Sequence, residues 1–260
     1  MSDTWVTLSK EGPLGIITLD RPPANSYDLH FLKNLNTAID GVGTDNNIKA
    51  ALLISASEKF FCAGADIKIS LGNTLEAHTR MINFAHQTLS KMARIPKVFI
   101  AVINGHALGG GLEIALACDL RLAGNGEFLL GLSESKLGTL PGNGGTQRLP
   151  RLIGAGPALE LMLTGRSVGP QQALQLGIVN HLFPAESLLD EAKEYALTLA
   201  NGPTKALAHI KRCVYEGLEK PLADGLALER ESSIVLFTTK DAREGLNAFV
   251  EKRAPEFKGK

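Results

Sequence analysis

The sequence predicts a mixed α/β fold that carries a helical region at its C-terminal end. Short apolar runs typical of strands alternate with amphipathic, helix-like segments up to about residue 186. Several of the strand-like runs are apolar throughout, which favours a sheet covered on both faces. Beyond residue 186 the strand signals fade and only helical patterns remain. These observations predict an α/β core followed by a helical appendage.

The composition is that of an ordinary globular protein. The chain has 260 residues, of which 44% are apolar and 21% charged, and 27 Lys plus Arg balance 27 Asp plus Glu. This balance argues against a general polyanion binder, because nucleic-acid-binding proteins carry excess positive charge. No apolar run approaches the roughly 20 residues that span a bilayer, and the first residues do not resemble a signal peptide. The three cysteines are too scattered for a disulfide scaffold or a zinc site, so we expect a cytoplasmic protein without metal.

The first elements form a hairpin, a helix and a buried strand. Strand-like runs at residues 5–8 and 14–19 flank the turn sequence at 11–13, which indicates a β-hairpin. Asp28 is placed to cap the next helix, and residues 49–55 form a buried strand. The apolar face expected for that helix carries Leu29, Leu32, Leu35 and Ile39.

The middle of the chain continues the alternation. A long helix is expected at residues 74–93, with an apolar stripe at steps of three and four. That stripe consists of Ile82, Ala85, Leu89 and Met92. The strongest strand is expected at residues 98–103, followed by a glycine-rich turn at 105–111 and a helix at 112–118. Further short strands are expected at 120–123, 128–130 and 178–182.

The C-terminal part reads as four helices and a short tail. The helices are expected at residues 186–200, 204–217, 222–237 and 240–253. We expect the tail at residues 255–260 to be frayed.

Two glycine-rich turns follow strand-like runs and lead into helices. The first contains the sequence FFCAGADIK at residues 60–68, and the second contains NGHALGGGLE at 104–113. A turn that opens a helix leaves backbone N–H groups unpaired, and the helix dipole adds partial positive charge there. Such ends can hold a phosphate or stabilise an oxyanion that develops during a reaction.

The phosphate alternative lacks its usual motifs. No GK pair followed by Ser or Thr is present, and residues 105–110 do not fit the G-x-G-x-x-G fingerprint. A purely structural role, in which the glycines permit tight turns and close packing, stays open for each turn alone.

Two glutamates lie near these turns. Glu113 falls in the first turn of the helix opened by the second glycine cluster, among apolar neighbours, and a buried carboxylate needs a partner. One alternative is a capping carboxylate that binds turn amides. Glu134 follows a strand-like run and precedes another glycine-rich segment; by itself it is typical of an exposed loop.

These segments together resemble the crotonase (enoyl-CoA hydratase/isomerase) superfamily. The resemblance covers essentially the whole chain in family order. The segments that carry it are CAGADIK at 62–68, NGHALGGGLE at 104–113, ACD at 117–119, GTLPGNGGTQRL at 138–149, LTG at 163–165, residues 173–180 and EGLNAFVEKR at 244–253. The resemblance implies a spiral of ββα units over residues 1–200 that holds the acyl-CoA site. It also implies a helical trimerisation region over residues 201–260.

The resemblance also implies a reaction. By position, the N–H groups of Ala65 and Gly110 would stabilise a thioester enolate. Hydratases of this superfamily carry two glutamates, one shortly after the glycine triplet and another about twenty residues on. Glu113 and Glu134 match these positions, so the resemblance favours hydration of a 2-enoyl-CoA, with Glu113 as base and Glu134 as acid. Because two coupled carboxyls titrate together, which of the two is the acid and which the base stays open.

The resemblance further implies binding residues and an oligomer. Coenzyme A is part of the substrate, so no separate cofactor is expected, and the assembly would be a homotrimer or a dimer of trimers. Phe249 and Lys252 would reach the CoA of a neighbouring subunit, although both also suit an ordinary amphipathic helix. Lys68 could meet the adenosine phosphates. The candidate binding residues are Ala63, Ala65, Asp66, Ile67, Lys68, Gly109, Gly110, Phe249 and Lys252.

Some residues depart from the family pattern. Residues 24–28 (ANSYD) differ from the more usual Asn-Ala-Leu run near the acyl pocket, and Leu132-Ser133 precede Glu134 where many hydratases have proline or threonine. Asn143 is bulkier and more polar than the residue often found between those glycines. These departures could alter the choice of acyl chain or indicate a specialised member.

Several alternatives stay open. His106 is expected to be a backbone-bonded structural residue, and Cys62 a small buried one. The rival functions are a crotonase-type isomerase or C–C lyase, a paired-carboxylate glycosidase, and a non-catalytic scaffold. The aromatic content of 5% argues against the glycosidase.

Overall fold

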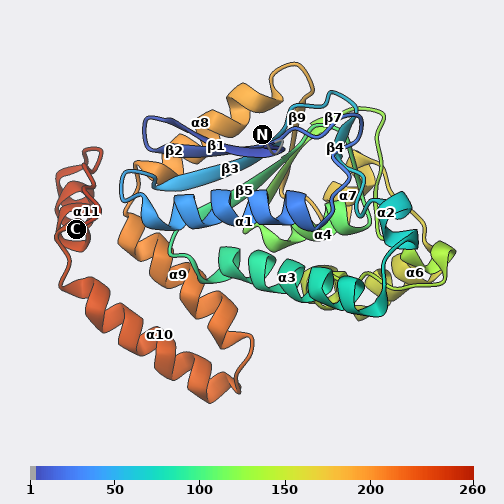
Figure 1. Cartoon of the computed structure of the whole chain (residues 1–260). Coiled ribbons are helices and arrows are strands. Elements are labelled where there is room, and N and C mark those ends of the chain that lie inside the picture. The colour runs from blue at the N-terminus through green and yellow to red at the C-terminus, as the bar shows by residue number, and fades with distance from the viewer. Residues whose placement is uncertain (1–3) are drawn as a thin grey trace.

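A computed structural model of the protein describes residues 4–260, which form two sheets of different size (Figure 1). Within these residues the large sheet has six strands in the order β1-β2-β3-β5-β7-β9, with β1 and β2 antiparallel and the other neighbours parallel. The small sheet has three parallel strands in the order β4-β6-β8. The strands are β1 (Val6–Glu11), β2 (Leu14–Leu19), β3 (Ala50–Ser55), β4 (Phe60–Cys62), β5 (Val98–Ile103), β6 (His106–Leu108), β7 (Leu120–Asn125), β8 (Leu130–Gly131) and β9 (His181–Pro184).

Successive strands alternate between the two sheets, which produces the expected spiral. β3, β5 and β7 join the large sheet, and the strands that follow them, β4, β6 and β8, join the small one. Each pair leads into a helical segment: α2 (Ile67–Leu71), α4 (Gly110–Ala117) or the short 3-10 helix η1 (Glu134–Leu137). Because β4, β6 and β8 are parallel neighbours, the turns that follow them lie at the same edge of the small sheet.

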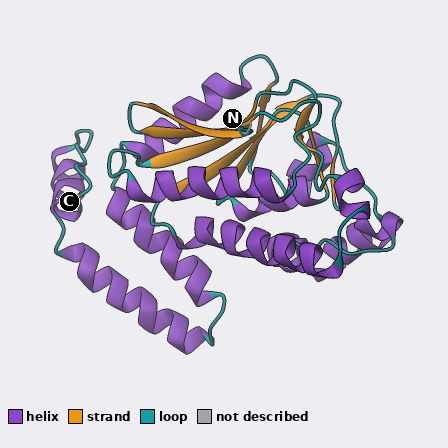
Figure 2. Cartoon of the chain, viewed as in Figure 1, coloured by secondary structure: helices purple, strands orange, loops and turns teal. Residues whose placement is uncertain are grey.

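Helices cover both faces of the large sheet (Figure 2). α1 (Leu29–Thr44), α3 (Leu75–Arg94) and α4 lie on one side, and α8 (Leu188–Ala200) lies on the other (Figure 1). In β3, Ala51 and Leu53 pack into the core that includes α1, whereas Ala50 and Leu52 pack with α8. All four are at most 1% exposed. Burial on both faces explains why this strand shows no polar alternation.

The remaining helices follow the small sheet and the last strand. They are α5 (Gly145–Ile153), α6 (Ala155–Thr164), α7 (Pro170–Gln175), α9 (Thr204–Gly217), α10 (Leu222–Phe237) and α11 (Lys240–Glu251). α10 and α11 extend away from the body of the molecule (Figure 1). α9 is held to the body by Lys211, whose Nζ lies 2.8 Å from Oδ2 of the largely buried Asp119.

Several elements differ in their bounds from those predicted, and some were not predicted. The predicted turn at residues 105–111 contains the strand β6, and α4 begins at Gly110 rather than at residue 112. β9 lies at 181–184 instead of 178–182, and α5, α6 and α7 were not predicted as helices. On α3, Met81 is buried at 6% exposure where Ile82 was expected to face the core.

The C-terminal tail is not frayed, so that prediction is wrong. The Asp241 carboxylate accepts hydrogen bonds from the backbone N–H groups of Lys258 and Gly259, both at 2.8 Å. The Asp241 N–H in turn donates to the carbonyl of Lys260 at 3.1 Å. The buried carboxylate at the start of α11 therefore holds residues 258–259 against this helix through hydrogen bonds.

Candidate active site

The first glycine turn connects β4 to α2 and leaves one N–H group without a partner. Gly64 has φ +92°, a conformation that favours glycine. Its carbonyl accepts a hydrogen bond from the Tyr27 N–H, and the Tyr27 carbonyl accepts one from the Asp66 N–H, both at 2.8 Å. Ala65 lies between these two bonds, and its own N–H has no hydrogen-bond partner among residues 4–260.

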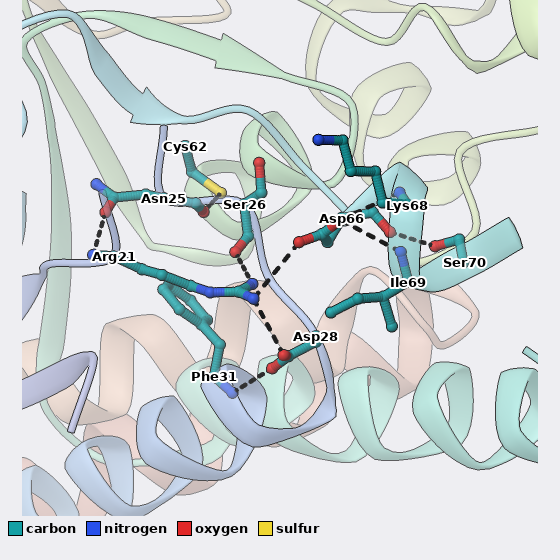
Figure 3. Close-up of polar contacts among 10 residues, drawn as sticks. All are labelled: Arg21, Asn25, Ser26, Asp28, Phe31, Cys62, Asp66, Lys68, Ile69 and Ser70. Atoms are coloured by element: carbon teal, nitrogen blue, oxygen red, sulfur yellow. Dashed lines mark hydrogen bonds and ion pairs between the residues drawn. The ribbon is translucent and has the colours of Figure 1, made fainter. Parts of the chain in front are cut away.

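Arg21 fixes this turn from the side (Figure 3). Its Nη2 lies 3.4 Å from Oδ2 of Asp66 and 3.2 Å from Oδ2 of Asp28, and its Nη1 donates to the Ser26 carbonyl. Both aspartates cap helices: Asp28 accepts from the Phe31 N–H at the start of α1, and Asp66 accepts from backbone N–H groups of α2. One guanidinium thus joins the beginnings of two helices next to Ala65.

The second glycine turn lies directly beside the first. Gly109 has φ +52° and caps α4, which begins at Gly110. The Gly110 N–H has no hydrogen-bond partner among the described residues. A Cβ added to Gly64 would lie 3.2 Å from this nitrogen. The two partnerless N–H groups, from Ala65 and Gly110, therefore occupy adjoining turns; their role as oxyanion donors stays a prediction.

Glu113 lies one helical turn beyond Gly110 and is 1% exposed. Its Oε1 accepts hydrogen bonds from the backbone N–H groups of Asn143 and Gly145, both at 2.7 Å. Burial raises the pKa of the Glu113 carboxyl, while the two N–H donors and the charge of Arg148 act in the opposite direction. The alternative of a carboxylate bound to turn amides is therefore realised too, through the turn that opens α5.

Glu134 lies in η1 and is half-buried rather than an exposed loop residue. A Cβ added to Gly109 would lie 2.8 Å from its Oε1, so this carboxyl lies against the second glycine turn. Its Oε2 is buried without a hydrogen-bond partner. Burial, followed by the charge of Glu113, raises the pKa of Glu134 to about 7. At neutral pH a large fraction of this carboxyl therefore keeps its proton.

Two carboxyls in different surroundings can act as an acid and a base. The amides that bind Glu113 favour its charged form, whereas Glu134 has an unpartnered, buried oxygen that favours its protonated form. Beside them lie two N–H groups suited to a developing oxyanion. This arrangement can stabilise an enolate and move protons at the same place.

The other predicted binding residues fall into two groups. Ala63, Asp66, Ile67, Lys68 and Gly109 lie in or next to the two turns, with Ile67 51% exposed. The Lys68 side chain extends away from the Asp66 carboxylate (Figure 3). Phe249, 86% exposed, lies on α11, and Lys252 ends that helix, far from α2 in Figure 1. Within one chain the structure does not bring these two residues to the site.

His106 and Cys62 have the roles expected of them. The His106 Nδ1 accepts a hydrogen bond from the Leu129 N–H at 3.1 Å. Cys62 is fully buried, and burial raises the pKa of its thiol to about 12, which makes it a poor nucleophile. No cluster of three metal-ligating side chains occurs within the described part of the chain.

Four residues around the site were not predicted to take part in it: Arg21, Tyr27, Asn143 and Arg148. The sequence marked residues 24–28 and Asn143 as unusual, but it did not show that Tyr27 and Asn143 touch. The Asn143 Nδ2 donates a hydrogen bond to the Tyr27 hydroxyl. The only signal available beforehand was that both positions depart from the usual pattern.

Comparisons with known proteins agree with this geometry. Residues 9–260 match the family model of enoyl-CoA hydratase/isomerase. The putative enoyl-CoA hydratase/isomerase YngF of Bacillus subtilis is 42% identical over 261 residues, with 100% of each chain covered. A short-chain-enoyl-CoA hydratase of Clostridium acetobutylicum is 37% identical, with 96% of each covered. The crystal structure of an enoyl-CoA hydratase from Geobacillus kaustophilus has a TM-score of 0.96 at 44% identity, over 100% of this chain and 98% of that one.

The spiral of strands, with its paired turns, defines a protein of the crotonase superfamily. Within that superfamily, this chain belongs to the enoyl-CoA hydratase/isomerase family. None of the helices in residues 4–260 combines the length and apolar character needed to cross a bilayer.

Proposed function

We propose that this protein adds water reversibly to the double bond of a 2-enoyl-CoA thioester and yields a 3-hydroxyacyl-CoA. The observation that carries this proposal is the placement of two partnerless N–H groups beside two carboxyls in different surroundings. Glu113 accepts two backbone N–H donors, and one oxygen of Glu134 is buried without a partner. Relatives named as hydratases, such as the Clostridium acetobutylicum enzyme, support it.

The N–H groups of Ala65 and Gly110 are proposed to bind the thioester oxygen. When water attacks the β-carbon, the electron pair of the double bond moves through the α-carbon to that oxygen, which gives an enolate. Preorganised donors stabilise such charge, and the loss of one donor in another enzyme costs about 3–4 kcal/mol. The partner-free state of both N–H groups leaves them available for this role.

The two glutamates are proposed to move the protons. Ionised Glu113 orients the water and takes one of its protons as the oxygen bonds to the β-carbon. Protonated Glu134 gives its proton to the α-carbon. The electron pair of the enolate forms the new C–H bond, and the thioester carbonyl is restored. Water is thus added in full, and the two carboxyls exchange protonation states until solvent resets them. When the hydroxyl group and the proton from Glu134 reach the same face of the double bond, the addition is syn.

The CoA portion is proposed to bind outside the catalytic turns. Lys68 is exposed beside Ala65 and is suited to contact the adenosine phosphates, with Ile67 along the same loop. Phe249 and Lys252 would contribute from a neighbouring subunit of a homotrimer or dimer of trimers. The three free cysteines suit a reducing compartment such as the cytoplasm.

The proposed function is tested with crotonyl-CoA and purified protein. We expect the wild type to consume the conjugated enoyl chromophore and form 3-hydroxybutyryl-CoA. Glu113→Gln and Glu134→Gln should each lower kcat by roughly 100-fold or more, since each removes one proton-transfer group. Glu127→Gln, which changes an exposed glutamate in the connection between β7 and β8, is the control and should keep full activity.

The products distinguish the alternatives. An enoyl-CoA isomerase would convert a 3-enoyl-CoA to the 2-enoyl form and give no hydroxyacyl product, and a crotonase-type lyase would cleave a C–C bond instead. Either outcome contradicts the hydratase proposal while keeping the oxyanion site. If wild type and both variants were inactive on every acyl-CoA tested, a non-catalytic role would be favoured.

A further inference from the structure

Tyr27 touches three separate parts of the candidate site. Its main chain pairs with Gly64 and Asp66, on either side of Ala65, through two hydrogen bonds of 2.8 Å. Its side chain is 3% exposed and belongs to the core that packs against α1. Its hydroxyl lies against Gly110, because a Cβ added at that glycine would overlap the hydroxyl oxygen. One residue therefore contacts both turns that carry the partnerless N–H groups.

The Tyr27 hydroxyl also reaches the turn that holds Glu113. It accepts a hydrogen bond from the Asn143 side chain, a residue 116 positions further along the chain and 4% exposed. The backbone N–H of that asparagine donates to Glu113 Oε1, and its carbonyl accepts from Arg148 Nη1 at 2.9 Å. A continuous set of contacts thus runs from Ala65 through Tyr27 and Asn143 to Glu113.

The hydroxyl is suited to a fixed, neutral role. Burial, followed by the negative charge of Glu113, raises the pKa of Tyr27 well above its usual range, so the phenol keeps its proton. A buried polar group without a partner is costly, and the Asn143 amide supplies one for the hydroxyl. This explains why the two buried polar residues occur together.

We propose that Tyr27 and Asn143 form a buried brace that sets the position of Glu113 relative to the N–H groups of Ala65 and Gly110. Both are positioning residues: they act through the turn at Asn143 and through Gly110, and not on the substrate. This inference rests on the proposed function, because the role of the brace is to hold the base at a fixed position relative to the oxyanion donors. Small displacements of catalytic groups lower rates strongly, by about 100-fold for 1 Å.

The kinetic test uses Tyr27→Phe and Asn143→Ala, which remove the bond but keep the ring and the backbone N–H to Glu113. With crotonyl-CoA we expect each variant to lose roughly 10-fold or more in kcat while KM changes little, because positioning affects the transition state. The double variant should lose no more than the worse single one, since both break one brace. Tyr195→Phe on α8, across the large sheet, is the control and should match the wild type.

Crystal structures of wild type and Tyr27→Phe test the brace without relying on activity. We expect the Glu113 carboxylate and the turn at Asn143 to shift or to occupy two positions in the variant. If Tyr27→Phe folds with Glu113, Asn143 and Gly110 unchanged, and both variants retain wild-type kcat, the brace is overturned. If instead the wild type lacks hydratase activity but the Tyr27→Phe structure shows the shift, the proposed function fails and the brace stands.

Discussion

Glu113 and Glu134 show how the surroundings of a residue decide its chemistry. Both are glutamates at one site, yet Glu113 accepts two backbone N–H donors while one oxygen of Glu134 is buried without a partner. Burial raises the pKa of both carboxyls. On Glu113 the two donors and Arg148 act against this rise, whereas on Glu134 the charge of Glu113 adds to it. This difference is what an acid and a base require.

The raised pKa values of the two carboxyls, with Glu134 as the proposed acid and Glu113 as the proposed base, predict a bell-shaped pH profile for hydration. The acid Glu134 loses its proton as pH rises through about 7, so kcat/KM should fall on the alkaline side. The base Glu113 becomes protonated as pH falls through its raised pKa, so kcat/KM should fall on the acidic side. Initial rates with crotonyl-CoA between pH 4 and 10 measure both limbs, which belong to the coupled pair.

Removal of one glutamate identifies the alkaline limb. In Glu134→Gln the residual rate should no longer decline near pH 7, because the group that titrates there is gone. An alkaline limb that persists unchanged in this variant would show that another group is the acid.

At the scale of single residues, local motifs marked the segments that the structure brings together, while the roles of their residues stay predictions. The two glutamates and the two turns lie together because each follows a strand of the same small sheet. The contact between Tyr27 and Asn143 was beyond prediction, because it joins residues 116 positions apart and leaves no local pattern. Arg21 was missed for the same reason: its partner Asp66 belongs to another element.

At the scale of elements, predictions failed where buried apolar residues lie outside a strand, or where a strand is partly exposed. Ile178 and Val179 are apolar and buried, which resembles a strand, but they lie in the connection before β9. The strand itself, residues 181–184, is partly exposed at the edge of the large sheet. β6 has three residues between glycines, too few to display the alternation that identifies a strand. Long helices with clear caps, such as α1 behind Asp28, were predicted correctly.

Arg21 binds the aspartate that caps the short helix α2, and we call this guanidinium and its two aspartates the Arg21 anchor. Its contribution is tested by Arg21→Gln. This change removes the positive partner of Asp28 and Asp66, which cap α1 and α2. We expect the free energy of unfolding to fall by about 1–3 kcal/mol, since hydrogen bonds between charged, largely buried groups are lost. We also expect kcat to fall, because Ala65 adjoins this anchor. Urea denaturation and crotonyl-CoA kinetics measure the two effects.

Arg166→Gln is the matched control for the anchor. Arg166 pairs with Glu160 at 3.0 Å, but the two side chains are 44% and 50% exposed. Water screens exposed pairs, which therefore contribute little, so stability should change little and kcat not at all. Equal effects of both substitutions would contradict a special role for Arg21.

At the scale of the whole molecule, alternation between two sheets is what assembles the site. The large sheet, buried on both faces, provides the rigid support, and the small sheet brings the ends of β4, β6 and β8 to one edge. Residues from distant segments meet there because their strands are spatial neighbours. The sequence predicted this arrangement through the family resemblance, since short strands such as β8 carry almost no signal of their own.

The C-terminal helices leave apolar side chains exposed, which favours assembly. A single domain seldom exposes so many large apolar residues close together in sequence. The most exposed on α10 and α11 are Leu222, Ile234, Phe237, Leu246, Phe249 and Val250, between 59% and 86%. These helices also project from the body of the molecule (Figure 1). Subunit contacts would cover this surface, in line with the proposed trimer.

We therefore predict a solution mass of three or six times that of one chain, measured by analytical ultracentrifugation. Ile234→Asp combined with Phe237→Asp should lower that mass, because charged groups at a buried contact are strongly unfavourable. KM for crotonyl-CoA should rise as well, since Phe249 and Lys252 would no longer reach a neighbouring CoA. Leu189→Asp, an exposed leucine on α8 across the sheet, should leave mass and KM unchanged. A wild type that is monomeric and fully active would contradict both the trimer and the contribution from the neighbouring subunit.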